Sequence, residues 1–327
     1  MKFTQPPDYS GVLLPSVPVD VAANAAPLVR GAGDPTAATG NGLTWLSFRP
    51  LETGPVTVAI AHPKSTVAPD EIHYHIWANG DVVAIETMIE RMPRILGIDE
   101  AALAGWAAFD ELLADTAHLL PHQVVEARRK NPGMRLMSTG QLVDELYTVV
   151  LEQKVTQRQA RATWRWFADT FGEASPAGEP APKIAPAPET ILQIQSWQWH
   201  TGWVQPFLAR TLKTVASRAT ALDRLAKKPL HDISTGLLSL PGIGPWTIAE
   251  TLQRTHGAAD LVSVGDFHLA HHIGEALTGQ RTNDAGMLEL LAPWRGHRQR
   301  LVRLIYASGI RFSRFGPRLA ATDFRDR

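Results

Sequence analysis

One carboxylate, Asp266, stands at a position that suits catalysis. In the run Val-Ser-Val-Gly-Asp-Phe-His-Leu at 262–269, an apolar stretch and a glycine bring it to the start of an expected helix. Backbone amides and the helix dipole favour an ionised carboxylate there, the form that stabilises a cationic transition state or takes a proton from water. An ordinary helix N-cap uses the same residue type at the same place, so both roles remain open.

Shortly before Asp266, a turn rich in glycine and proline joins two helical patterns. The run Leu-Pro-Gly-Ile-Gly-Pro-Trp-Thr-Ile-Ala at 240–249 predicts a helix–hairpin–helix. Gly242 and Gly244 are able to take positive φ and to let another backbone approach, while Pro245 suits the first position of a helix. Successive amides in such a turn form a concavity that binds phosphate without reading bases. A pair of helices with no ligand is the alternative.

Together, the segments 240–249 and 265–269 resemble the helix–hairpin–helix DNA glycosylase superfamily. Further runs at 151–156, 197–200 and 292–295 are similar to its alkylated-base branch, the bacterial 3-methyladenine DNA glycosylase II group. The resemblance covers most of the chain and implies a mainly α fold, with a small antiparallel α/β domain ahead of the glycosylase body. It implies base flipping in duplex DNA and hydrolysis of the N-glycosidic bond of an alkylated base.

The same resemblance assigns roles to single residues. Asp266 becomes the catalytic carboxylate, and Gly242, Gly244 and Thr247 belong to the DNA-binding hairpin. Trp246 occupies the place of the lysine that forms a Schiff base in members that also cut the strand, so we expect a monofunctional enzyme without lyase activity. Its indole is expected to line the base pocket by stacking or to pack in the core.

Other residues are expected to touch the DNA outside the base pocket. Gln153 and Lys154 match the position of the wedge that fills the gap left by a flipped nucleotide, although a solvated lysine at a helix end explains Lys154 equally well. Arg295 and Arg298, with Arg300 and Arg303, are expected to contact phosphates, some of them pairing internally instead. The segment 291–327 holds nine arginines and two aspartates.

The expected partner is duplex DNA with alkylated bases, bound by a monomer without a nucleotide cofactor. A structural monovalent cation at the carbonyls of 239–244 is allowed by the resemblance. His268, His271 and His272 invite a metal site, but no glutamate accompanies them, so no catalytic metal is expected. The alternatives are a helix–hairpin–helix protein that binds DNA without chemistry, against which Asp266 argues, and an oxidised-base glycosylase, against which Trp246 argues.

Composition limits the classes of protein and of chemical site that these interpretations allow. The chain has 327 residues, 44% of them hydrophobic, and no cysteine, which excludes disulfides, thiolate metal sites and a cysteine nucleophile. No apolar run reaches the length of a membrane span, so we expect a cytoplasmic, nucleoid-associated protein that does not bind membranes. The net charge is zero.

The elements that position these residues follow from periodicity. Strands are expected at 44–48, 56–61 and 72–78, with a further one around 17–21. From residue 84 onward, helices are expected at 84–96, 100–118, 122–130, 139–152, 156–171, 188–194, 205–228, 232–240, 245–256, 267–277, 284–291 and 297–308. These assignments divide the chain into a small α/β domain at 1–83, with an irregular start, and an all-α body at 84–327 that contains a long Pro/Ala-rich loop at 172–188. Asp144, Glu145 and Glu152 are expected on a solvated acidic helix face.

Overall fold

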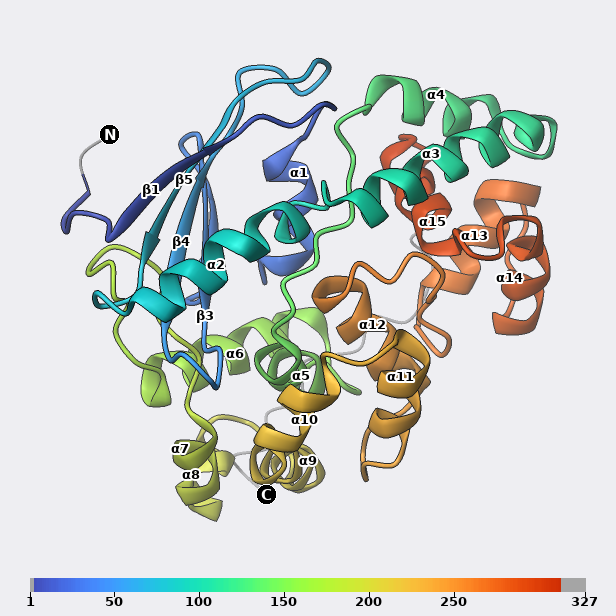
Figure 1. Ribbon diagram of the computed structural model, residues 1–327. Helices are drawn as coiled ribbons and strands as arrows, with labels where there is room; N and C mark the ends of the chain where they lie inside the picture. Colours follow the sequence, from blue (N-terminus) through green and yellow to red (C-terminus); the bar gives the residue numbers. More distant parts are fainter. Residues whose placement is uncertain (1–2, 313–327) are drawn as a thin grey trace.

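The structure is a computed structural model that describes residues 3–312. Its amino-terminal part is a five-stranded antiparallel sheet with the strand order β1-β5-β4-β3-β2 (Figure 1). The strands are β1 (Tyr9–Leu13), β2 (Ala37–Gly40), β3 (Leu43–Phe48), β4 (Val56–Ala61) and β5 (Ile72–Trp77). The three central strands agree with the sequence prediction, which missed both edge strands.

The edge strands escaped prediction because their sequences lack the strand pattern. In β1, Gly11 lies against the ring of Tyr74 on β5, where any Cβ would collide with that ring. The strand expected around 17–21 is wrong. A short helix, α1 (Val21–Ala25), begins there instead, because the Asp20 side chain accepts a hydrogen bond of 2.9 Å from Ala23 N and caps it.

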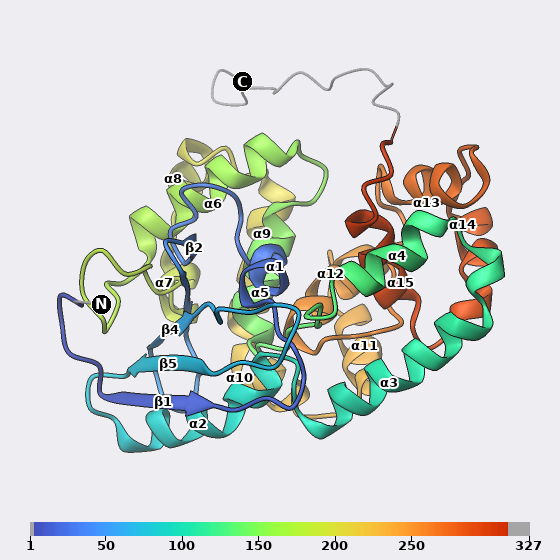
Figure 2. The same ribbon diagram turned by 90° about the horizontal axis from the view of Figure 1, so that it is seen from above.

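Both faces of the sheet are covered. Helix α2 (Val82–Ile95) packs on one face (Figure 2), and its Met88 and Met92 share a core with the strands, so this core continues past residue 83. On the other face, Trp45 and Trp77 stack at 5.3 Å and contact Ala177 of the Pro/Ala-rich loop. This loop is therefore a cover for the sheet rather than a free linker.

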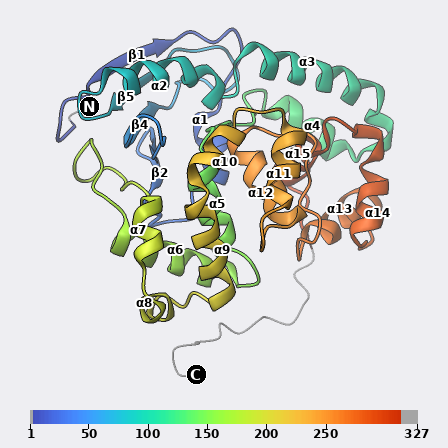
Figure 3. The same cartoon turned by 60° about the horizontal axis from the view of Figure 1, so that its bottom comes forward.

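The helices form two groups, each with its own hydrophobic core (Figure 3). The first group contains α5 (Leu142–Leu151), α6 (Gln157–Phe171), α7 (Pro188–Gln193), α8 (Ser196–Thr201), α9 (Pro206–Ser217), α10 (Ala219–Leu225), α11 (Leu230–Leu238) and α12 (Pro245–Thr255). The second contains α3 (Glu100–Asp115), α4 (His122–Lys130), α13 (Leu269–Thr278), α14 (Asp284–Leu290) and α15 (Arg298–Ala307). Single 3-10 turns occur at Ala26–Leu28, Ala117–Leu119 and Ala292–Trp294.

The chain visits the second group twice. It leaves the sheet through α2, builds α3 and α4, returns along 131–141 to start α5, and re-enters the second group only after α12. Trp106 and Phe109 of α3 therefore share a core with Ile273 of α13 and Leu301 of α15. A mainly α fold with a small antiparallel sheet agrees with the sequence prediction.

Most helix bounds lie within three residues of those read from the sequence. The exceptions are α8, which periodicity did not reveal, and the segment 205–228, which breaks into α9 and α10 at Arg218. Within residues 3–312, no helix combines the length and apolar character needed to span a bilayer. Four of the nine carboxy-terminal arginines, Arg314, Arg318, Arg325 and Arg327, lie outside the described residues.

Candidate active site

The hairpin between α11 and α12 uses its two glycines differently. Gly242 has φ +87°, and a Cβ there would collide with Thr211 of α9, so both the backbone and the packing require glycine. Gly244 instead has φ −120° and ψ −179°, an extended conformation open to any residue, which corrects the expectation of positive φ. No atom of the described chain lies within 4 Å of a Cβ placed on Gly244, so this side of the hairpin is open.

Gln153 braces the hairpin from the loop after α5. Its Nε2 donates hydrogen bonds to the Gly242 carbonyl at 3.0 Å and to Thr247 Oγ1 at 2.9 Å. Thr247 is buried, with 3% of its surface exposed. These bonds hold the hairpin in shape, and the contacts of Gln153 and Thr247 with DNA stay a prediction.

Lys154 stands exposed at the tip of the same loop. Its φ of +54° is in the left-handed region, which costs a non-glycine residue about 1 kcal/mol or more. Its Nζ lies 5.8 Å from the ring centroid of Phe207, at the start of α9. The strained backbone of Lys154 therefore holds its ammonium group on the surface, next to the hairpin that Gln153 braces.

Asp266 is held from three directions. Its Oδ1 accepts hydrogen bonds of 2.8 Å from the backbone N–H groups of His268 and Leu269, where α13 begins. Its Oδ2 accepts a bond of 3.3 Å from Trp246 Nε1. The carboxylate thus serves the start of the helix as a cap does, and the same half-buried side chain lines a cavity. The structure thus confirms the capping role, and the catalytic role stays a prediction.

Trp246 sits on the first turn of α12, half-exposed, with its ring N–H directed at Asp266. It is not among the residues that line the cavity. The structure therefore places this indole beside the carboxylate and partly exposed rather than in the core, and its stacking on a flipped base stays a prediction.

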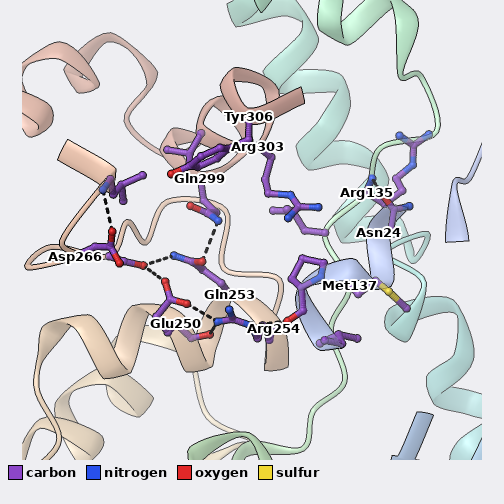
Figure 4. A pocket seen from close by; sticks show the side chains of 16 residues that line it. Asn24, Arg135, Met137, Glu250, Gln253, Arg254, Asp266, Gln299, Arg303 and Tyr306 are labelled. Atoms are coloured by element: carbon purple, nitrogen blue, oxygen red, sulfur yellow. Dashed lines mark hydrogen bonds and ion pairs between the residues drawn. The ribbon is translucent and has the colours of Figure 1, made fainter. Parts of the chain in front are cut away.

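The cavity has a volume of about 190 Å³ and opens where the three cores meet (Figure 4). The wall is formed by the 3-10 turn after α1, the irregular segment 135–137, α12, the start of α13 and α15. Most of the lining side chains are polar: Asn24, Arg135, Glu250, Gln253, Arg254, Ser263, Asp266, Gln299, Arg303 and Tyr306. Asp266 lies at one end and Asn24 at the other.

A network of charged side chains fixes the α12 side of the cavity. Arg254 Nη1 donates to Glu250 Oε2 at 2.7 Å, and Arg254 Nε donates to the Pro27 carbonyl at 2.9 Å. Glu250 also accepts from the Ser263 hydroxyl. Burial raises the pKa of Glu250, but Arg254 and Ser263 outweigh it and hold that pKa below its usual value. Because Asp266 N donates to the Ser263 carbonyl at 3.1 Å, the network also supports the catalytic candidate.

The same network overturns the expectation of a solvated acidic face on α5. Glu145 pairs with Arg30 and lies 3.6 Å from Arg254, and Glu152 lies 3.5 Å from Arg30. Asp144 is half-buried and accepts a hydrogen bond of 2.8 Å from Arg49 N, and its partial burial raises its pKa to about 7. These carboxylates join α5 to the amino-terminal segment and to α12.

The carboxy-terminal arginines divide into different environments. Arg298 makes a bidentate pair with Asp260, with both nitrogen–oxygen distances at 2.7 Å, and Arg300 is buried over the ring of Trp106. Arg298 is thus engaged by an acidic partner and Arg300 is buried, and the phosphate contacts expected for them stay a prediction. Arg295 is exposed at the carboxy end of a 3-10 turn, and Arg303 reaches into the cavity.

The histidines after Asp266 form an aromatic stack. His268 and His272 lie 5.5 Å apart with parallel rings, and His272 stacks on Phe312 at 4.2 Å. His271 Nδ1 lies 2.9 Å from the Thr282 carbonyl. Within residues 3–312, no group of three His, Cys, Asp or Glu side chains is placed to hold a metal ion.

Sequence reasoning missed most of the cavity wall. Along α12, four residues separate Trp246 from Glu250 and four more separate Glu250 from Arg254. This spacing would have predicted that the three side chains share one helix face. No local signal connects Asn24 or Arg30 to the site, because they reach it through the packing of the amino-terminal segment.

Comparison with known proteins agrees with this architecture. No protein-family model matches the chain. The chain is 24% identical over 173 residues to the DNA-3-methyladenine glycosylase of Bacillus subtilis (strain 168), which covers 51% of this chain and 57% of that protein. The chain thus spans little more than half the length of this curated relative.

Two solved structures share the fold over nearly their whole length. The 3-methyladenine DNA glycosylase from Archaeoglobus fulgidus superposes with a TM-score of 0.71 at 15% identity, covering 91% of this chain and 98% of the other. The Clostridium acetobutylicum 8-oxoguanine glycosylase/lyase in its apo form gives 0.66 at 9% identity, covering 94% and 100%. Similarity at these identities establishes the fold.

Proposed function

We propose that this chain, which has the fold of the helix–hairpin–helix DNA glycosylases, is a monofunctional DNA glycosylase that removes alkylated bases from duplex DNA. The observation that carries the proposal is the placement of Asp266, whose carboxylate is held by two backbone amides and an indole at the edge of a cavity of about 190 Å³. The name of the curated relative and the fold of the Archaeoglobus enzyme support the same activity.

The chemistry follows from the position of the carboxylate. A base flipped out of the duplex would enter the cavity with its glycosidic bond near Asp266. As this bond breaks, positive charge develops on the sugar, and a fixed carboxylate stabilises that charge without reorganisation. Asp266 also orients the water that attacks the sugar carbon, and the proton of this water passes to the carboxylate or to solvent.

The absence of an amine at the site supports hydrolysis without strand cleavage. Trp246 offers only an indole N–H, which is not nucleophilic, and no lysine is among the cavity-lining residues of the described chain. Formation of a Schiff base with the sugar requires such an amine. This argues against the lyase activity that the name of the Clostridium protein includes.

DNA would lie across the surface that carries the open side of Gly244 and the exposed Lys154, whose neighbour Gln153 braces the hairpin. Amides at the start of α12 are suited to a backbone phosphate, and the ammonium of Lys154 adds charge attraction that depends on salt. A contact of the exposed Arg295 with a more distant phosphate stays a prediction. Such a substrate places the protein at the nucleoid.

The test is release of bases from methylated duplex DNA. We expect the wild-type protein to release methylated purines and leave an intact abasic site, with no protein–DNA adduct trapped by borohydride. Asp266→Asn should retain DNA affinity and lose base release by about 100-fold or more, as removal of an electrostatic stabiliser does. Unchanged base release by Asp266→Asn would refute the catalytic assignment, and a trapped adduct would refute the monofunctional one.

A further inference from the structure

The amide side chains on the cavity wall have a defined orientation. Gln253 Nε2 donates to the Leu261 carbonyl at 2.9 Å, and because a carbonyl only accepts, the amide cannot be reversed without losing this bond. Gln253 Oε1 therefore accepts the bond of 2.9 Å from Gln299 Nε2. This leaves Gln299 Oε1, on α15, as a hydrogen-bond acceptor with no partner among residues 3–312.

Arg303 follows Gln299 by one helical turn on α15 and extends into the cavity (Figure 4). Among the described residues, its guanidinium makes one hydrogen bond, a long one of 3.4 Å to the Ala23 carbonyl. Burial, together with repulsion from Arg254, lowers the pKa of Arg303. Its remaining N–H groups are therefore donors without an acceptor among residues 3–312.

The wall thus offers a fork of donors from Arg303 and, one helical turn away on α15, the acceptor Gln299 Oε1. Guanine presents two adjacent acceptors, N7 and O6, followed by the donor N1–H, whereas adenine presents N7, the donor N6–H₂ and the acceptor N1 in alternation. An arginine fork matches two adjacent acceptors, and it opposes the exocyclic amine of adenine. Gln299 Oε1 would accept from N1–H of guanine.

We propose that Arg303 and Gln299 select purines that carry a carbonyl at C6, so that the cavity prefers guanine-type over adenine-type alkylated bases. This inference rests on the proposed function and narrows its substrate class. Net charge does not explain such a preference, because 3-methylguanine and 3-methyladenine carry the same positive charge in DNA. The two bases differ at C6, which faces Arg303 in this arrangement, and at C2.

The experiment measures both bases released from one methylated duplex DNA, each as a rate per lesion present. We expect wild type to release 3-methylguanine faster than 3-methyladenine by about 5- to 150-fold, the range that one well-placed bidentate contact gives. Arg303→Met keeps the length of the side chain and removes the donors, so the ratio should fall to near one. Arg129→Met, at an exposed arginine of α4 paired with Glu126, is the matched control and should keep the wild-type ratio.

Each outcome decides the proposal. If wild type releases neither base, the proposed function itself fails. If wild type releases both equally, or if Arg303→Met slows both by one factor, the function stands and the selection by Arg303 is refuted. Affinity for duplex DNA with an abasic-site analogue is measured in parallel. A loss of this affinity in Arg303→Met, with the ratio preserved, would assign Arg303 to a phosphate and also refute the proposal.

Discussion

Arg254→Met tests whether the buried network beside the cavity stabilises the fold. Arg254 and Glu250 each have 16% of their side chains exposed, and Glu145 has 9%. Methionine fills similar space but leaves both carboxylates without this cation. Removing one partner of a buried pair costs about 3–5 kcal/mol, because the other charge stays buried without compensation. With a urea m-value of about 3 kcal/mol/M, the unfolding midpoint should fall by about 1 M or more.

The pH dependence of the stability lost in Arg254→Met identifies the cause of that loss. In wild type, the pKa of Glu250 is held below its ordinary value of 4.5, so the paired carboxylate stabilises the fold above that pH and stops doing so as pH falls through its lowered pKa. Arg254→Met lacks this contribution. The deficit should be greatest near pH 7 and should narrow below about pH 4.5, as Glu250 becomes protonated.

Urea unfolding of wild type, Arg254→Met and Arg129→Met at pH 7 and pH 4 makes the comparison. Arg129 forms an exposed pair with Glu126, so its loss should change stability by no more than about 1 kcal/mol. A deficit for Arg254→Met as small as that of the control, or one that does not vary with pH, would refute the reasoning.

Two further substitutions address single contacts. Trp246→Phe removes the indole N–H that donates to Asp266 Oδ2 at 3.3 Å. We expect single-turnover base release to slow by about tenfold, which corresponds to the lower end of the free energy of a hydrogen bond to a charged group. An unchanged rate would show that the indole does not position the carboxylate. Asp144→Asn removes a half-buried acid whose pKa, raised to about 7, makes wild type lose stability as pH rises from about 4 to above 7. The variant should be more stable than wild type by about 1–3 kcal/mol at pH 8 and equally stable near pH 4. Thermal melts in which wild type is as stable as the variant at pH 8 would contradict this.

The features that the sequence predicted well are those encoded locally. The order Leu-Pro-Gly-Ile-Gly-Pro-Trp carries its own turn residues and helix start, so the hairpin and the position of Asp266 were predictable from neighbouring residues alone. The wall of the cavity was not. Arg30 and Arg254 meet the same carboxylate from positions far apart in the chain, and the acidic residues of α5 looked solvated because their partners are distant.

One pair of glycines and one pair of arginines show the same limit of prediction from sequence. Gly242 requires glycine because of Thr211, a residue of another helix, whereas the open surface around Gly244 has no counterpart in the sequence pattern. Arg298 and Arg303 look alike in a basic helix, but one is bound by Asp260 and the other extends into the cavity. Only tertiary packing separates an arginine that supports the structure from one that is available to a ligand.

The double visit of the chain to the second helical group has a consequence for biosynthesis. When α3 and α4 leave the ribosome, the partners of Trp106 and Phe109 on α13 and α15 are still more than a hundred residues from being made. The first group can close on its own core during translation, while the apolar side of α3 waits in water for the last quarter of the chain. A nascent or truncated product ending before α13 would therefore expose this aromatic surface, making it a target for chaperones and proteases.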